Sequence, residues 1–365
     1  MAMTDISDLH SNSCGKSSFR HDFLKWYSPR QLPSHEEFSH LLHQVISLLE
    51  HEDASYRPTS QADTPGGLVD LVENHPAVPT MLVPDLHGRG DFFKKILEFR
   101  PNLAVYFPQL VTQQELSVLE LLEAGFMNLV CVGDGLHSEL YRERWLLALE
   151  EYEAGNLMER ALTEEMTEGL ELMTLVMRCK LAFPRHFHFL KGNHENIMNR
   201  WGKGDRPFKK FAREGDMSRD FIQQYYGDDI LYLYSHFEQL LPLLVQAPRC
   251  LVSHSEPARH FSRQEVINAL TDSAGEVVYG LTWTRNDESQ EGAVASMLQE
   301  FLPQWCGEGK NSCLYFGGHR TIGETYRLRQ DGLFVQFHNP RRYQVALVPV
   351  HRSFDFDLDF IQLGN

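Results

Sequence analysis

Five short motifs in the sequence combine acidic, amide and imidazole side chains with glycine or serine. In chain order they are Asp85-Leu86-His87-Gly88, Gly133-Asp134-Gly135-Leu136-His137, Gly192-Asn193-His194-Glu195, Ser253-His254 and Gly317-Gly318-His319. Glycine beside a polar residue lets the backbone turn sharply and approach closely. Mixed carboxylate and imidazole ligands suit Mn, Fe, Zn or Ni better than Ca or Mg, and the lack of thiolates argues against a structural zinc site. The candidate metal ligands are Asp85, His87, Asp134, Asn193, His254 and His319.

The chemistry that this set favours is phosphoester hydrolysis by two metal ions. Two ions roughly 3.5–4 Å apart can activate one water and clamp the phosphate. Asp134 is the natural bridging carboxylate, and Asn193 ligates without adding negative charge that would repel phosphate. One Asp-x-His alone would be read as an ordinary turn. Five motifs in order, each after a strand-like run, favour one site over five unrelated turns.

Each motif follows a short apolar run, and helical stretches lie between the runs. The runs begin at residues 79, 126, 187, 250 and 313. Strands that alternate with helices predict an α/β fold. Functional groups at the carboxyl ends of the strands are typical of such sheets, so we expect the five motifs to meet at one edge.

The rest of the chain is assigned more coarsely. We expect a helical N-terminal extension over 1–75 and a catalytic domain over 76–365, with a Glu-rich helical insertion at 139–181. Capping boxes predict helices that begin at Ser34 with Glu37 and at Thr112 with Glu115. Residues 333–338 and 343–350 look like paired closing strands.

Charge and cysteine usage exclude several classes of protein. The net charge of −16 argues against a general nucleic-acid binder. Six scattered cysteines without a CxxC pair favour reduced thiols and a cytoplasmic location. The start lacks the apolar segment of a signal peptide, and no run of eighteen apolar residues predicts a membrane span. Cys14-Gly15-Lys16-Ser17 ends like a phosphate-binding loop but has His10 where that motif needs glycine.

The motif order resembles the calcineurin-like metallophosphoesterases, and it is most similar to their phosphoprotein phosphatase (serine/threonine phosphatase) branch. That branch has GDxHG, GDxxDRG, GNHE, a His near HGG and a later GH, which here read PDLHG, GDGLHSE, GNHE, SHSEP and GGHR. The resemblance covers about residues 79–350. It implies a two-sheet β-sandwich flanked by helices in four αββα layers, and a phosphoprotein or small phosphoester as substrate.

The resemblance also implies roles for individual residues. One metal would take Asp85, His87 and Asp134, and the other would take Asp134, Asn193, His254 and His319. A hydroxide shared by the metals would attack phosphorus, and His194 would protonate the leaving group. Arg285, in the segment Leu281-Thr282-Trp283-Thr284-Arg285, would hold phosphate together with Asn193 and His194.

The second motif departs from the family pattern. His137 and Ser138 stand where the family has the Asp that partners the acid His and a phosphate-binding Arg. Arg89, Arg142 and Arg144 are candidates to replace the Arg, and Glu139 is a candidate to orient His194. His137 beside His194 would lower the pKa of His194, because two imidazoles are not both protonated cheaply.

The departures leave two alternatives to a phosphomonoesterase. One is a dinucleoside polyphosphatase or phosphodiesterase. Many phosphodiesterase-like members end in GHxH, in which the second His is also a ligand. Here the segment is Gly318-His319-Arg320-Thr321, and the missing second His favours the phosphatase or polyphosphatase side. The other alternative is a catalytically weak module that keeps the fold to bind phosphate.

Overall fold

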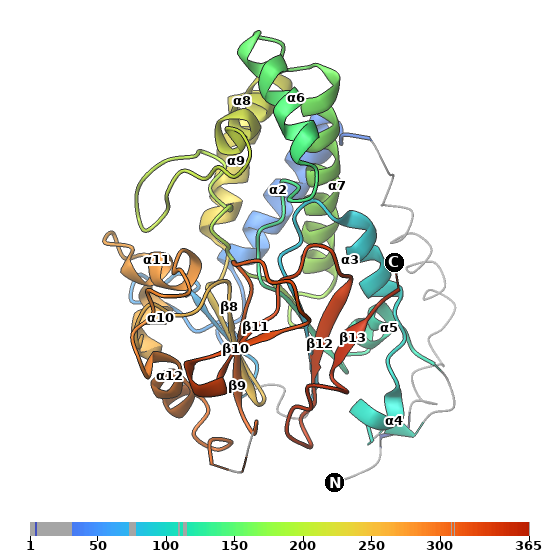
Figure 1. The fold of residues 1–365 in the computed structure, drawn as a ribbon, viewed down its shortest axis with the longest axis vertical. Helices are drawn as coiled ribbons and strands as arrows, with labels where there is room; N and C mark the ends of the chain where they lie inside the picture. The colour runs from blue at the N-terminus through green and yellow to red at the C-terminus, as the bar shows by residue number, and fades with distance from the viewer. Residues whose placement is uncertain are drawn as a thin grey trace.

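The computed structural model describes residues 4–5, 31–72, 78–108, 110–111, 115–307, 309 and 311–364. Two β-sheets face each other and helices cover both outer faces (Figure 1). The predicted two-sheet sandwich flanked by helices is therefore confirmed. The Cys14-Gly15-Lys16-Ser17 segment lies outside the described residues.

The first sheet has five strands in the order β13-β12-β3-β5-β6. Its strands are β3 (Thr80–Val83), β5 (Asn128–Cys131), β6 (Phe187–Phe189), β12 (Gln344–Val348) and β13 (Phe360–Gln362). Strands β3, β5 and β6 are parallel, with Val83 beside Cys131 and Cys131 beside Phe189. Their carboxyl ends therefore meet at one edge.

The second sheet has six strands in the order β10-β11-β9-β8-β7-β2. Its strands are β2 (Leu68–Asp70), β7 (Leu244–Ala247), β8 (Cys250–Ser253), β9 (Leu314–Gly317), β10 (Arg327–Arg329) and β11 (Phe334–Gln336). Strands β8, β9 and β11 run parallel, so their carboxyl ends also share an edge. The short strands β1 (Thr4–Asp5) and β4 (Leu110–Val111) pair apart from both sheets.

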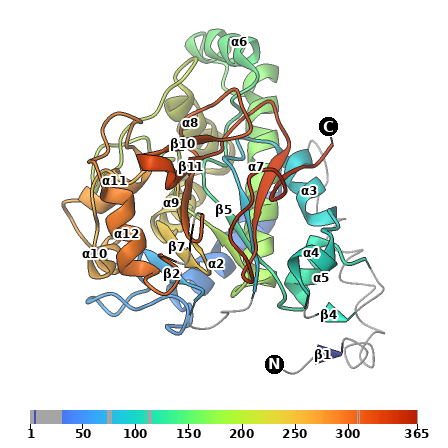
Figure 2. The ribbon, with the colours of Figure 1, turned by 60° about the horizontal axis from the view of Figure 1, so that its bottom comes forward.

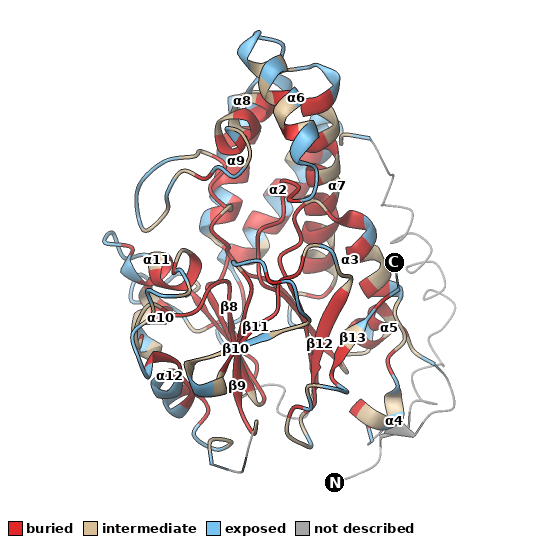
Figure 3. Cartoon of the chain, in the orientation of Figure 1, coloured by how far each residue is buried: buried red, intermediate tan, exposed pale blue. Residues whose placement is uncertain are grey.

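Alternating side chains divide the core into three layers. Along β3, Leu82 points between the sheets, whereas Met81 and Val83 point outward under helices. The period of two in a strand causes this alternation. Both faces of β3 and of most other strands are buried, as Figure 3 shows in red for β8, β9 and β12, whereas β10 and part of β13 are more exposed.

Helices of two groups complete the outer layers (Figure 2). The first group covers the five-stranded sheet and comprises α2 (His35–Glu50), α3 (Gly90–Glu98), α4 (Leu103–Tyr106), α5 (Val118–Glu123), α6 (Arg142–Glu153), α7 (Arg160–Ala182), α8 (Glu214–Tyr226) and α9 (Asp228–Gln239). The second group covers the six-stranded sheet and comprises α10 (Arg263–Asn268), α11 (Glu276–Thr282) and α12 (Ala293–Phe301).

Two helix starts can be compared with the sequence prediction. Ser34 and Glu37 form the expected capping box at α2. Helix α5 begins later than predicted, because Ser117 and Glu120 form the capping box there. Thr112 lies outside the described residues.

The parts assigned to an N-terminal extension and an insertion share the main core. Helix α2 packs against α7 and α9, and β2 pairs with β7 in the six-stranded sheet. Helix α7 also contacts β6. Residues on both sides of the predicted boundary at 75 are therefore built into one core, and that boundary stays a prediction.

The predicted pairing of residues 333–338 with 343–350 is wrong. Strand β11 pairs with β9 and β10, whereas β12 pairs with β3 and β13 in the other sheet. The segment between them contains Pro340 and carries the chain from one sheet to the other. A hairpin would have kept both strands in one sheet.

No helix within the described ranges is both long enough and apolar enough to cross a membrane.

Candidate metal centre

The predicted ligands lie just beyond the carboxyl ends of five strands that belong to both sheets. Asp85 and His87 follow β3, Asp134 follows β5, and Asn193 follows β6. His254 follows β8 and His319 follows β9. His319 is partly buried and the other five are buried. The edge expected from the sequence is therefore formed jointly by the two sheets.

Short distances connect these side chains. His87 Nε2 lies 3.6 Å from Asp134 Oδ2 and 3.9 Å from Asp85 Oδ2. His254 Nε2 lies 2.9 Å from Asn193 Oδ1 and 3.5 Å from Asp134 Oδ2. His319 Nδ1 lies 2.9 Å from Asn193 Oδ1. The structure thus brings all six residues together, with Asp134 between His87 and His254.

The loops that carry these residues are held by backbone contacts. The Glu195 carboxylate accepts the backbone N–H of Asp134, Gly135 and Gly192. A Cβ at Gly192 would lie 2.2 Å from Asp134 Oδ1, so no other residue fits there without displacing that carboxylate. Glu195 thus ties the β5 and β6 loops to each other.

The hydrogen bonds of two imidazoles decide which ring nitrogen carries the proton. His87 Nδ1 lies 3.1 Å from the backbone oxygen of His137, and His254 Nδ1 lies 2.9 Å from that of Val132. A carbonyl accepts only, so each Nδ1 must donate. In the neutral ring, Nε2 then bears a lone pair. This is the arrangement that metal-binding histidines usually adopt.

Both ring nitrogens face carboxylate or amide oxygens. His87 Nε2 faces the Asp134 and Asp85 carboxylates, and His254 Nε2 faces Asn193 Oδ1 and Asp134. Burial lowers the pKa of His87 well below its usual value, and burial also lowers that of His254. A cation among these groups would compensate the facing oxygens and ring nitrogens. The residues present therefore fit a metal site.

The buried carboxylates of the cluster also fit a metal site. Burial, then Glu195 and Asp85, raises the pKa of Asp134 well above its usual value. Buried carboxylates need a paired cation or a proton. Within the part of the chain that the structure describes, three groups have ligand atoms close enough to share one ion: Asp85, Asp134 and His254; Asp85, His87 and His338; and His87, His137 and His194.

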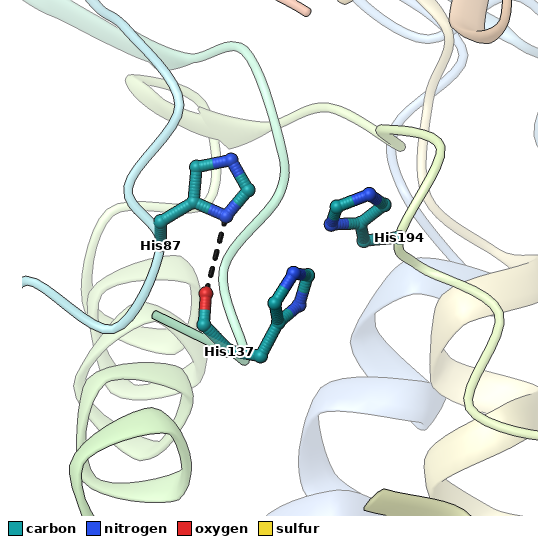
Figure 4. A group of neighbouring side chains, drawn as sticks. All are labelled: His87, His137 and His194. Carbon is teal, nitrogen blue, oxygen red and sulfur yellow. Dashed lines mark hydrogen bonds between the residues drawn. The ribbon is translucent and has the colours of Figure 1, made fainter. Parts of the chain in front are cut away.

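His194 and His137 lie beside this cluster (Figure 4). Their ring centroids are 4.2 Å apart, and both rings stack on Phe208. His194 Nδ1 lies 3.6 Å from Asp134 Oδ2. Neither His137 nitrogen has a hydrogen-bond partner among the described residues. Burial, with a contribution from Lys210 against the opposing effect of Glu214, lowers the pKa of His137 to about 4.

The cations considered for phosphate lie in different places. Arg285 is 69% exposed, follows α11, and contacts Glu288 at 3.9 Å. Its charge reaches the site, since burial and then His254, Arg320, His338 and Arg285 lower the pKa of His319. Arg89 donates to the backbone oxygens of Asp85, Leu86, Pro340 and Arg342, and Arg144 pairs with Glu165 and Glu168.

Three residues near the cluster were not predicted in these roles. The sequence made Glu139 a candidate to orient His194. Its carboxylate instead contacts His87, His338 and Lys210. His338 follows β11, so the rule that found the other ligands could have found it. Lys210 lies in the loop before α8, and no sequence signal marked it.

Comparison with known proteins supports the fold. No protein-family model and no curated protein matches the sequence. Among solved structures, the chain is similar to a protein serine/threonine phosphatase from Saccharomyces cerevisiae with similarity to human phosphatase PP5, at 15% identity and a TM-score of 0.51, covering 91% of this chain and 89% of that one. A cold-active protein-tyrosine phosphatase of a psychrophilic Shewanella species matches at 14% identity and a TM-score of 0.44 over 79% and 80% of the two chains, which is too weak to carry an argument. The first likeness shows the fold alone, a two-sheet sandwich flanked by helices, in agreement with the four αββα layers expected from the sequence.

Proposed function

We propose that this protein is a metal-dependent phosphomonoesterase of the serine/threonine protein phosphatase type. One observation carries the proposal: buried His87 and His254 direct ring nitrogens at carboxylate and amide oxygens at the strand ends, an arrangement that suits cations. The fold and the order of the motifs agree with this function.

Two ligand sets share Asp134. Asp85, His87 and Asp134 would hold one ion, and Asp134, Asn193, His254 and His319 would hold the other. Mn, Fe, Zn and Ni all suit such ligands. Bound ions would supply an activated water and positive charge for the phosphate oxygens.

His194 is the candidate general acid. Its side chain is 13% exposed, compared with 4% for His87, so it can meet a substrate at the mouth of the cluster. Its backbone N–H donates to Asp134 Oδ1 at 3.0 Å, which fixes the loop beside the ligands. In this proposal His194 protonates the leaving oxygen, His137 tunes that imidazole, and Arg285 holds a phosphate oxygen.

A cavity of about 280 Å³ adjoins His87 and offers room for the group attached to phosphate. Tyr141, Tyr343 and Glu168 are among the residues that line it. Aromatic faces and carboxylates favour a polar organic group such as a peptide segment over a second phosphate. The cavity therefore has room for part of a phosphopeptide.

The test combines metal analysis with two leaving groups. The full chain should bind up to two transition ions and hydrolyse p-nitrophenyl phosphate only when loaded. His194→Asn should keep the ions but slow turnover on an alkyl phosphate by roughly 10²–10⁴, the usual range for a general acid. The loss should be smaller for p-nitrophenyl phosphate, whose leaving group needs no proton. Equal losses on both would assign His194 to binding or structure.

A second function, phosphate binding without turnover, is favoured by His137 and Ser138 in the second motif. Phosphate binding by a fully metal-loaded chain that hydrolyses no ester would support it. Faster hydrolysis of diesters or dinucleoside polyphosphates than of monoesters would favour the polyphosphatase or phosphodiesterase alternative.

A further inference from the structure

His338 follows the third parallel strand of the six-stranded sheet, as His254 and His319 follow the first two. Strands β8, β9 and β11 are neighbours, and His338 lies two residues beyond β11. Its side chain is fully buried, with Nε2 3.8 Å from Asp85 Oδ2. His338 thus reaches the ligand cluster by the same route as the two predicted histidines of this sheet.

Glu139 joins His338 to His87. Its Oε2 lies 2.6 Å from His338 Nε2 and 3.0 Å from His87 Nε2, and its Oε1 accepts from Lys210 Nζ. Because His87 Nδ1 donates to a carbonyl, the contact at 3.0 Å joins a nitrogen lone pair to a carboxylate oxygen. Two acceptors at this distance repel each other unless a positive charge lies between them.

The separation suits two ligands of one ion. With metal–ligand bonds of about 2.1 Å, ligand atoms at a right angle lie roughly 3.0 Å apart. Glu139 also adds a third buried carboxylate to Asp85 and Asp134, and Lys210 is the ammonium that contacts it. Together with the buried guanidinium of Arg89, this ammonium gives two cations against three carboxylates, so the pocket still favours a further cation.

We infer that Glu139 and His338 are additional ligands of the metal position formed by Asp85 and His87. This inference rests on the proposed function but goes beyond it, because the family resemblance places no ligand at either residue. The position would then be enclosed by protein side chains and would retain its ion more strongly than the position at His254 and His319. Lys210 is a positioning residue that holds Glu139 in place.

The test is metal affinity of the full chain after chelator treatment, titrated with Mn²⁺ and followed by equilibrium dialysis and by the Mn²⁺ electron paramagnetic resonance spectrum. Glu139→Gln and His338→Asn should each raise the Kd of one ion by about 10–100-fold or more, the range seen even for groups that only support ligands. The Kd of the second ion should stay unchanged. His254→Asn should weaken that second ion instead.

Thermal melting separates a ligand from a structural residue. Removing a ligand leaves the metal-free chain at least as stable and reduces the stabilisation by Mn²⁺. A structural residue would lower the melting temperature equally with and without Mn²⁺. His188→Asn is the matched control, because His188 is equally buried but contacts Lys180 and Arg185 away from the cluster.

The outcomes for the inference and for the proposed function differ. The assignment of Glu139 or His338 would be overturned if the wild-type protein binds two ions and the variant at that residue binds Mn²⁺ with unchanged affinity. That result would leave the proposed function intact. Wild-type protein that binds no ion would overturn the proposed function itself.

Discussion

Replacing Glu195 by Gln is the sharpest test of how the strand-end loops are held. Glu195 is 3% exposed, and its carboxylate accepts three backbone N–H groups. Oε2 accepts from Asp134 at 2.9 Å and from Gly192 at 2.6 Å, and Oε1 accepts from Gly135 at 2.9 Å. Glutamine has one acceptor oxygen and one NH₂ group in the same shape.

The best orientation of Gln keeps its oxygen on Asp134 and Gly192. Its NH₂ then faces the Gly135 N–H, so one charge-assisted bond worth about 1.5–3 kcal/mol is lost and a buried donor is left unpaired. The other two bonds become neutral and weaker. Removing the charge also relieves repulsion, because Glu195 is the second cause, after burial, that raises the pKa of Asp134. We therefore expect a net loss of roughly 2–4 kcal/mol.

Guanidinium unfolding of the chelated and the Mn²⁺-loaded chain measures this loss. The loss should be larger with Mn²⁺, because the ion already offsets the repulsion that the substitution relieves. Glu150→Gln, at an exposed position on α6, is the control and should change the free energy of unfolding by less than about 0.5 kcal/mol. A Glu195→Gln chain as stable as wild type in both states would refute the role of Glu195 in holding the loops.

Three further predictions concern the centre itself. Asp134→Ala should lose most of both ions by elemental analysis, because Asp134 lies between the two ligand sets; full metal content would disprove the bridge. His137→Asp should move the basic limb of the pH–rate profile to higher pH. Burial and then His137 lower the pKa of His194. A carboxylate in place of the His137 ring raises the pKa of His194, so His194 keeps its proton to higher pH. An unmoved basic limb would show that the two side chains are uncoupled. Arg285→Ala should weaken monoester kcat/KM by roughly 1.5–3 kcal/mol, with partial recovery in Arg285→Lys and a smaller effect on diesters. Wild-type kinetics in Arg285→Ala would mark it as a surface residue.

The α/β core and the meeting of its motifs could be predicted because two local signals coincide, whereas the two-sheet sandwich was implied by the family resemblance. Apolar runs such as 80–83 and 314–317 predict strands, and a residue two positions beyond each run, Asp85 or His319, carries ligand chemistry. Parallel strands place such residues at one edge without any knowledge of the loops.

The wrong or missing predictions concern contacts between distant parts of the chain, which local sequence signals do not determine. Strands β11 and β12 were recognised, but alternation does not say which sheet a strand joins, so they were paired wrongly. His338 was overlooked because it belongs to no short motif, although its place after β11 matches that of His319 after β9. Lys210 reaches Glu139 from a loop, and the position of a loop tip depends on tertiary packing.

The backbone dihedral angles at three candidate ligands are unfavourable for residues other than glycine. His87, Asp134 and His319 have φ of 44°, 52° and 59°, in the left-handed region where glycine is the cheapest residue. Contacts between loops maintain these conformations: His87 N–H donates to Asp134 O at 2.7 Å, and Gly88 N–H donates to Gly135 O at 2.8 Å. Each non-glycine residue in this region costs about 1–2 kcal/mol. Asp and His at these positions therefore make sense if their side chains are needed there, and the proposed metal centre would use all three of them.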